Sequence, residues 1–138
     1  MILSNTATYV IRVLSLMATN QQKQYTAEHL IKKLNISDKY LRRLMTQLSK
    51  AGLIKSIRGR GGGYVFARPT DTIFLIDIIN AVEESDKYTG CILGFPHCSD
   101  DNPCVLHNQW AKIKEDIMEM LSTTSLQMIV ENNNISRF

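Results

Sequence analysis

Hydrophobic residues in the first half of the chain recur every three or four positions, which is the spacing of helices with one buried face. The pattern predicts helices over residues 5–18, 26–34 and 38–51. Thr26 and Ser37 stand where the second and third helices need an N-cap. Only three residues separate these two helices, so they are expected to meet through a tight turn. The buried face of the third helix is formed by Leu41, Leu44, Met45 and Leu48.

The helical spacing stops after the third helix, where two short β-prone runs follow. They cover residues 53–57 and 64–67. The glycine-rich basic segment Arg58–Gly63 separates them, so a hairpin is expected. Two helices joined by a tight turn and followed by a basic hairpin are typical of a winged helix-turn-helix. The expected fold class is therefore mainly α with a small β-hairpin wing (α+β).

The second half of the chain alternates between apolar helices and one polar segment. A helix is expected from a cap at Asp71 or Thr72 to Val82, and a loop over residues 83–103, where glycine, proline and cysteine occur. The remaining elements are a long helix from about Cys104 to Leu121, a short helix near Ser125–Glu131, and a tail over residues 132–138 that is expected to fray.

The composition excludes several classes of protein. With 138 residues, of which 44% are hydrophobic, the chain suits one domain with a core of its own. No run approaches eighteen apolar residues, so neither a transmembrane helix nor a membrane partner is expected. The N-terminus lacks the pattern of a signal peptide, so we expect a cytoplasmic location in which the three cysteines remain thiols or ligands.

Charge is distributed unevenly along the chain. Residues 1–70 contain twelve Lys or Arg and two acidic residues, while residues 71–138 contain four and eleven. A basic half of this kind indicates a face that binds a polyanion, here a double-stranded DNA operator, although a solvated basic surface is the alternative. Basic side chains on a helix can enter the major groove, and arginines among glycines can enter the minor groove. The candidate DNA-binding residues are Thr26, Ser37, Lys39, Tyr40, Arg42, Arg43, Gln47, Lys50, Arg58, Gly59, Arg60 and Gly61.

The cysteines form a second candidate site. Cys91, Cys98 and Cys104 are separated by six and five residues, and His107 follows three positions after the last. Thiolate and imidazole groups bind iron–sulfur clusters and zinc, although zinc sites more often include a C-x2-C pair. Cys104 and His107 are expected on one face of the long helix. An iron–sulfur cluster ([2Fe–2S] or [4Fe–4S]), zinc, no metal and thiol oxidation all stay open. A thiol enzyme using Cys98 and His97 lacks a third orienting group, so an enzyme is not expected.

Four segments carry a resemblance to a known family: Ile36–Leu44, Ile57–Tyr64, Cys91–Gly94 and Asn102–His107. They resemble the Rrf2 family of winged helix-turn-helix transcriptional regulators, in particular its cysteine-bearing, IscR- and NsrR-like subgroup. The similarity covers residues 1 to about 121. It implies a bacterial, homodimeric, sequence-specific DNA-binding repressor, switched by an iron–sulfur cluster on the three cysteines with His107 as the tentative fourth ligand.

The resemblance also assigns roles and shows departures. Lys39, Arg42 and Arg43 would read or brace the major groove, and Arg58 the minor groove. Arg42 and Arg43 stand where the iron–sulfur-assembly regulator has an acid and an amide, so its operator is not transferred. The loop has one extra residue between its first two cysteines, and Thr8 stands where nitric-oxide sensors can offer an acidic ligand.

The resemblance further implies that the long helix packs against its mate in a dimer. An apolar stripe on that helix agrees, although it could instead pack within its own subunit. The stripe consists of Trp110, Ile113, Ile117, Met120 and Leu121. The predicted organisation is a DNA-binding domain (1–82, with the wing at about 53–67), a cysteine-bearing sensor loop (83–103), and a dimerisation helix with a C-terminal tail (104–138).

Overall fold

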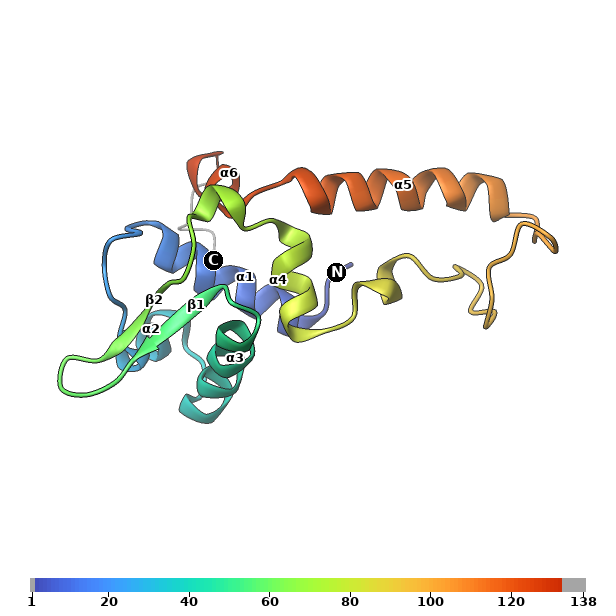
Figure 1. Ribbon diagram of the computed structural model, residues 1–138. Helices are drawn as coiled ribbons and strands as arrows, with labels where there is room; N and C mark the ends of the chain where they lie inside the picture. The colour runs from blue at the N-terminus through green and yellow to red at the C-terminus, as the bar shows by residue number, and fades with distance from the viewer. Residues whose placement is uncertain (1, 133–138) are drawn as a thin grey trace.

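A computed structural model describes residues 2–132 of the chain; residue 1 and residues 133–138, which include most of the tail expected to fray, lie outside the described part (Figure 1). The fold is mainly helical with one antiparallel hairpin, as predicted. In chain order the elements are α1 (Asn5–Ala18), α2 (Ala27–Leu34), α3 (Asp38–Lys50), β1 (Ile54–Ile57), β2 (Gly63–Phe66), the 3-10 helix η1 (Thr70–Thr72), α4 (Leu75–Val82), the 3-10 helix η2 (Ser85–Tyr88), α5 (His107–Thr123) and α6 (Leu126–Asn132).

The first three helices share one hydrophobic core. Leu14 of α1, Leu30 of α2 and Leu44 of α3 are all fully buried in it. The predicted N-caps are both present, because Thr26 Oγ1 accepts the His29 N–H at 3.1 Å and Ser37 Oγ accepts the Tyr40 N–H at 3.2 Å. Capping and periodicity therefore place α1, α2 and α3 close to the predicted positions.

The wing (residues 53–67) is fastened to the helical body by backbone hydrogen bonds at Tyr25. Tyr25, just before α2, exchanges two backbone hydrogen bonds with Tyr64 of β2, at 3.0 and 2.7 Å. The adjacent Gly63 has no room for a side chain, since a Cβ there would lie 2.5 Å from the Tyr25 carbonyl oxygen. The base of the wing is thus fixed beside the start of α2, while its tip projects from the helices (Figure 1).

The start of the fourth helix differs from the prediction. Asp71 and Thr72 do not cap α4; they belong to η1, and α4 begins at Leu75. The intervening residues are extended because they pair with the segment before α6: the Leu126 N–H donates to the Ile73 carbonyl at 2.7 Å, and the Leu75 N–H donates to the Thr124 carbonyl at 3.0 Å. This long-range pairing has no periodic signal in the sequence.

The long helix begins later than predicted. α5 starts at His107, so Cys104 precedes it and does not share a helical face with His107. Gly90, Pro96 and Pro103 fall in the segment before α5. Because proline has no backbone N–H to donate, it disfavours an earlier start of the helix. We call residues 89–106, between η2 and α5, the cysteine loop.

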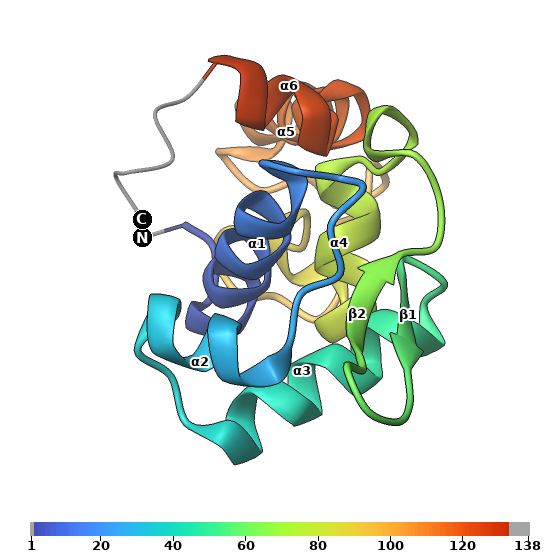
Figure 2. The ribbon, with the colours of Figure 1, turned by 90° about the vertical axis from the view of Figure 1, so that its left-hand side faces the viewer.

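The cysteine loop and α5 form an arm that extends from the body (Figure 1). α6 then returns and packs on α1, with Leu126 fully buried in the main core (Figure 2). The C-terminal segment therefore contributes to the same core as α1 and α3. Within residues 2–132, no helix is long and apolar enough to cross a membrane.

Candidate nucleic-acid interface and cysteine loop

α3 divides its side chains between the core and the outside. Leu41, Leu44, Met45 and Leu48 are buried as predicted. Lys39, Arg42, Arg43 and Lys50 are exposed on the opposite side, and Gln47 is half-buried between them. We call the four exposed cations of α3, together with Arg58 and Arg60 of the wing, the basic face.

The guanidinium of Arg42 is held by an acidic residue one turn earlier. Its Nε donates to both carboxylate oxygens of Asp38, at 2.9 and 3.0 Å. Arg43 lies instead over the ring of Tyr40, with 5.4 Å from Cζ to the ring centroid. Sequence reasoning did not single out Asp38, although an acid four residues before an arginine on a helix is a readable signal.

Three predicted DNA-binding residues also have roles in the fold. Thr26 and Ser37 are the caps described above. Tyr40 is half-buried; its ring meets that of Tyr9 edge-on at 5.5 Å, and its hydroxyl donates to Thr6 Oγ1 at 3.5 Å. Tyr40 therefore connects α3 to α1.

The tip of the wing is exposed and carries the two predicted arginines. Gly59 and Gly61 both have positive φ, at 98° and 76°, a conformation that glycine adopts without strain. Gln24 Nε2 donates to the Gly61 carbonyl and so links the tip to the body. A groove of about 320 Å³ separates the wing from α3, with Arg58 on one wall and Arg42 on the other.

The cysteine loop brings its three thiols and His107 around one small cavity. Cys91, Cys98, Cys104 and His107 all line it, and its volume is about 20 Å³. That is close to the space needed by a single water molecule. Within residues 2–132, no three cysteine, histidine or carboxylate side chains converge in a geometry that would hold a metal ion.

The donor chemistry nevertheless fits a thiolate-bound group. Burial raises the pKa of the Cys91 thiol, but hydrogen bonds from the backbone N–H groups of Phe95, Leu93 and Gly94, and from Cys98, outweigh it and lower that pKa overall. These donors favour the thiolate, which is the form that binds iron or zinc.

His107 is buried and has two polar partners. Its Nδ1 lies 3.5 Å from Cys98 Sγ, and its Nε2 lies 2.6 Å from Asp100 Oδ1. An imidazole whose second nitrogen meets a carboxylate is the usual arrangement of a metal-binding histidine. His97, which also lines the cavity, is exposed.

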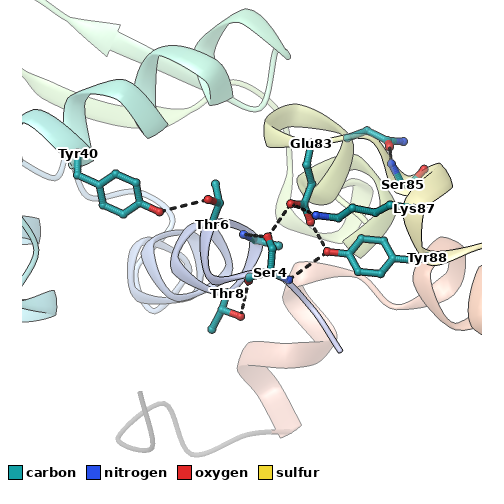
Figure 3. A network of polar contacts seen from close by, with 10 residues as sticks. Ser4, Thr6, Thr8, Tyr40, Glu83, Ser85, Lys87 and Tyr88 are labelled. Carbon is teal, nitrogen blue, oxygen red and sulfur yellow. Dashed lines mark hydrogen bonds and ion pairs between the residues drawn. The ribbon is translucent and has the colours of Figure 1, made fainter. Parts of the chain in front are cut away.

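A polar cluster fastens the start of α1 to the chain that leads into the cysteine loop (Figure 3). Ser4, the N-cap of α1, donates its hydroxyl to Glu83 Oε2 at 2.6 Å and its N–H to the Tyr88 hydroxyl oxygen at 3.1 Å. Tyr88 and Lys87 also donate to Glu83. About eighty positions separate Ser4 from these partners, so no local sequence signal could have found the cluster.

The predicted dimer stripe of α5 is partly covered within the chain itself. Leu121 is 2% exposed and packs with Ala7 and Ile79, and Ile117 packs against the same cluster. Trp110 is half-buried and donates its Nε1–H to the Gly90 carbonyl at 2.6 Å. Ile113 and Met120 are 47% and 53% exposed.

The sequence of this chain was compared with models of known protein families, and the family that matches is one of transcriptional regulators. Residues 3–132 match the model of Rrf2, described as an iron-dependent transcriptional regulator. The chain belongs to the Rrf2 family. The predicted winged-helix regulator, and not an enzyme, is thereby confirmed.

Individual relatives of this Rrf2 regulator are also regulators. A putative HTH-type transcriptional regulator of Aquifex aeolicus (strain VF5) is 33% identical over 133 residues, 94% of this chain and 92% of the relative. IscR of Xenorhabdus nematophila is 38% identical over 100 residues, which are 72% of this chain and 60% of that regulator. The match therefore spans less than two thirds of that IscR.

Two solved structures have the same fold. CymR, the global cysteine regulator of B. subtilis, is 27% identical, with a TM-score of 0.78 over 96% of this chain and 98% of that chain. T. potens IscR is 27% identical, with a TM-score of 0.75 over 99% of this chain and 90% of that chain. This Rrf2 regulator is thus similar both to a cysteine regulator and to IscR proteins.

Proposed function

We propose that this Rrf2 regulator binds duplex DNA as a homodimer, with α3 of each subunit in a major groove and each wing at a minor groove. The observation that carries the proposal is the basic face, whose two halves stand on either side of one groove. Lys39, Arg42 and Arg43 lie on the α3 half, where they would meet base edges or phosphates. Arg58 lies on the wing half, where a narrow minor groove attracts arginine.

The cysteine loop is the proposed sensor. The thiolates of Cys91, Cys98 and Cys104 would hold an iron–sulfur cluster, which would supply a redox-active group at the loop. The cavity between these thiols is about 20 Å³, so the loop must open to receive such a group. His107 would offer Nδ1 as the fourth ligand, which is supported by the contacts of its two ring nitrogens with Cys98 and Asp100.

The route from sensor to DNA is proposed to run through α1. Tyr88 and Glu83, at the entrance to the loop, hold Ser4 at the start of α1. α1 in turn meets α3 through Thr6 and Tyr40. A change in the loop would shift the populations of two placements of α1, and with it the direction of α3.

A second candidate keeps the fold and changes the sensor chemistry. Zinc would be closed into a four-ligand Cys₃His site, and the Cys98–His107 contact favours this alternative as well. The regulator could also be switched without a metal, by thiol oxidation, a partner protein or a small molecule. In that case the cysteine substitutions would not change the metal content.

The experiment is anaerobic purification with iron, sulfide and zinc analysis, followed by DNA binding to duplexes selected from a random pool. We expect iron and sulfide in the wild type, loss of both in Cys98→Ala, and a labile remainder in His107→Ala. Val105→Ala in the same loop, at a 92% exposed position that does not line the cavity, is the control and should leave metal content unchanged. Zinc without sulfide would support the second candidate, and a protein that enriches no duplex sequence would contradict the DNA-binding role.

A further inference from the structure

Asp38 is an acidic residue in the middle of the basic face. Residues 1–70 contain only one other acid, Glu28. A carboxylate at this position is repelled by DNA phosphates, so it weakens binding unless something offsets the repulsion. α3 does not need Asp38 as a cap, because Ser37 already accepts the Tyr40 N–H. Asp38 lies in the first turn of α3, where a carboxylate stabilises the helix, and its side-chain partner there is Arg42 of the basic face.

The contact with Arg42 uses one particular part of the guanidinium. Asp38 takes the Nε–H alone, through both of its oxygens. Among residues 2–132, Nη1 and Nη2 of Arg42 make no hydrogen bond that would compete for them. Their outer edge is the one that pairs with O6 and N7 of guanine. Asp38 thus holds the Nε side of the Arg42 guanidinium and leaves its Nη1/Nη2 edge available to a base.

Arg43 provides a natural contrast. Its guanidinium lies over the Tyr40 ring and has no carboxylate partner on α3. Arg42, in comparison, lies on the wall of the groove between α3 and the wing. Of the two neighbouring arginines, Arg42 is the one held by a carboxylate, in an exposed pair one helical turn apart, and this contact lowers the entropy that its side chain loses on binding.

We propose that Asp38 is a positioning residue for sequence readout: it holds Arg42 so that the Nη1/Nη2 edge meets a guanine in the major groove. Its negative charge also competes with phosphates for Arg42, and so disfavours binding to DNA of any sequence. This inference rests on the proposed function, because it requires α3 to lie in the major groove.

The test is a thermodynamic cycle in the full-length protein. Duplexes are first selected from a random pool by the wild type, and each base pair of the selected site is then replaced in turn. Affinities at fixed salt are measured for the wild type, Asp38→Ala, Arg42→Ala and the double variant. A bidentate arginine–guanine pair discriminates by about 5- to 150-fold. Circular dichroism and thermal unfolding check that each variant is folded.

We expect Arg42→Ala to abolish discrimination at one G·C pair, and Asp38→Ala to reduce it at the same pair by about threefold to tenfold. Binding of Asp38→Ala to unrelated duplexes should be equal or stronger, which the loss of a helix-stabilising residue alone would not produce. Asp38→Asn keeps one acceptor for Nε, so it should retain most of the discrimination. In the Arg42→Ala background, Asp38→Ala should have no further effect on discrimination.

Two results would overturn this inference while leaving the proposed function intact. One is unchanged discrimination in Asp38→Ala at every position of the selected site. The other is a loss of discrimination from Asp38→Ala that persists in the Arg42→Ala background, since Asp38 would then read a base itself, such as the N4 amino group of cytosine. A wild type that selects no sequence would overturn the proposed function, and this inference with it.

Discussion

The body and the arm of this regulator differ in how completely they bury their apolar side chains. In the body, Val10, Leu30 and Leu44 are fully buried, and side-chain caps hold the N-terminal ends of α1, α2 and α3. In the cysteine loop, Phe95 and Val105 are 56% and 92% exposed. Exposed apolar residues in a cluster are typical of a surface that something else covers.

This difference indicates that the body supports the basic face, while the arm is the part of the fold that can change. The basic face rests on a core of fully buried side chains, so the helix and hairpin that carry its cations are held in place. The arm has apolar side chains that the chain itself leaves exposed, and the proposed ligand among its thiols and the proposed second subunit would each cover part of them. A sensing segment is expected to come from the least stable part of a fold, because a small binding free energy can then change it.

The largest contrast should appear when one leucine is shortened in each region. Leu44→Ala leaves a cavity in the core and should cost about 2–5 kcal/mol of unfolding free energy. Leu93→Ala, at a half-exposed position of the loop, should stay within about 0.5 kcal/mol. Urea denaturation at one protein concentration measures both. Equal losses would show that the loop is part of the same core and would remove the contrast.

The apolar surface of α5 offers the next largest effect. Ile113→Asp places a charge on the exposed part of the proposed dimer stripe and should weaken association by about 2–4 kcal/mol. Ile117 is a poorer choice, because it packs within its own chain and its replacement would also lower the stability of the subunit itself. Analytical ultracentrifugation should show monomers. Thermal unfolding at low protein concentration, where the wild type is also dissociated, should give the same temperature for both proteins.

The matched control for that dimer test is Lys112→Asp, which changes the charge at an exposed neighbouring position of the same helix. It should leave the dimer intact. A dimer that survives Ile113→Asp and Met120→Asp together would place the interface elsewhere on the molecule.

Local patterns predicted the helices and the hairpin well and the long-range contacts poorly, and the reason is physical. Periodicity and caps depend on residues within a few positions of one another, so α1, α2, α3 and the hairpin were predicted nearly in place. The start of α4 depends on pairing with the segment before α6. The roles of Asp100 and Glu83 depend on how the loop and α1 pack in space. Such contacts leave no spacing in the sequence that could reveal them.

The connection between arm and body depends on Glu83, and its substitution should give the smallest of these effects. Burial raises the pKa of Glu83, but hydrogen bonds from Lys87, Ser4 and Tyr88 outweigh it and hold that pKa below its ordinary value of 4.5. Glu83→Gln keeps the shape, removes the charge and should cost about 1–2 kcal/mol of unfolding free energy at pH 7.

The dependence on pH gives this prediction its sharpest form. A carboxylate with a lowered pKa in the folded state stabilises fully above the pKa of the unfolded chain, and this stabilisation is lost as pH falls through the folded value. The difference in unfolding free energy between wild type and Glu83→Gln should therefore be constant from pH 8 to about pH 6 and shrink below pH 4.5. Glu84→Gln, at the exposed neighbouring position, should match the wild type throughout. A difference that grows as the solution becomes more acidic would mean that Glu83 is held in its protonated form, and that the bonds to Ser4 and Tyr88 do not depend on its charge.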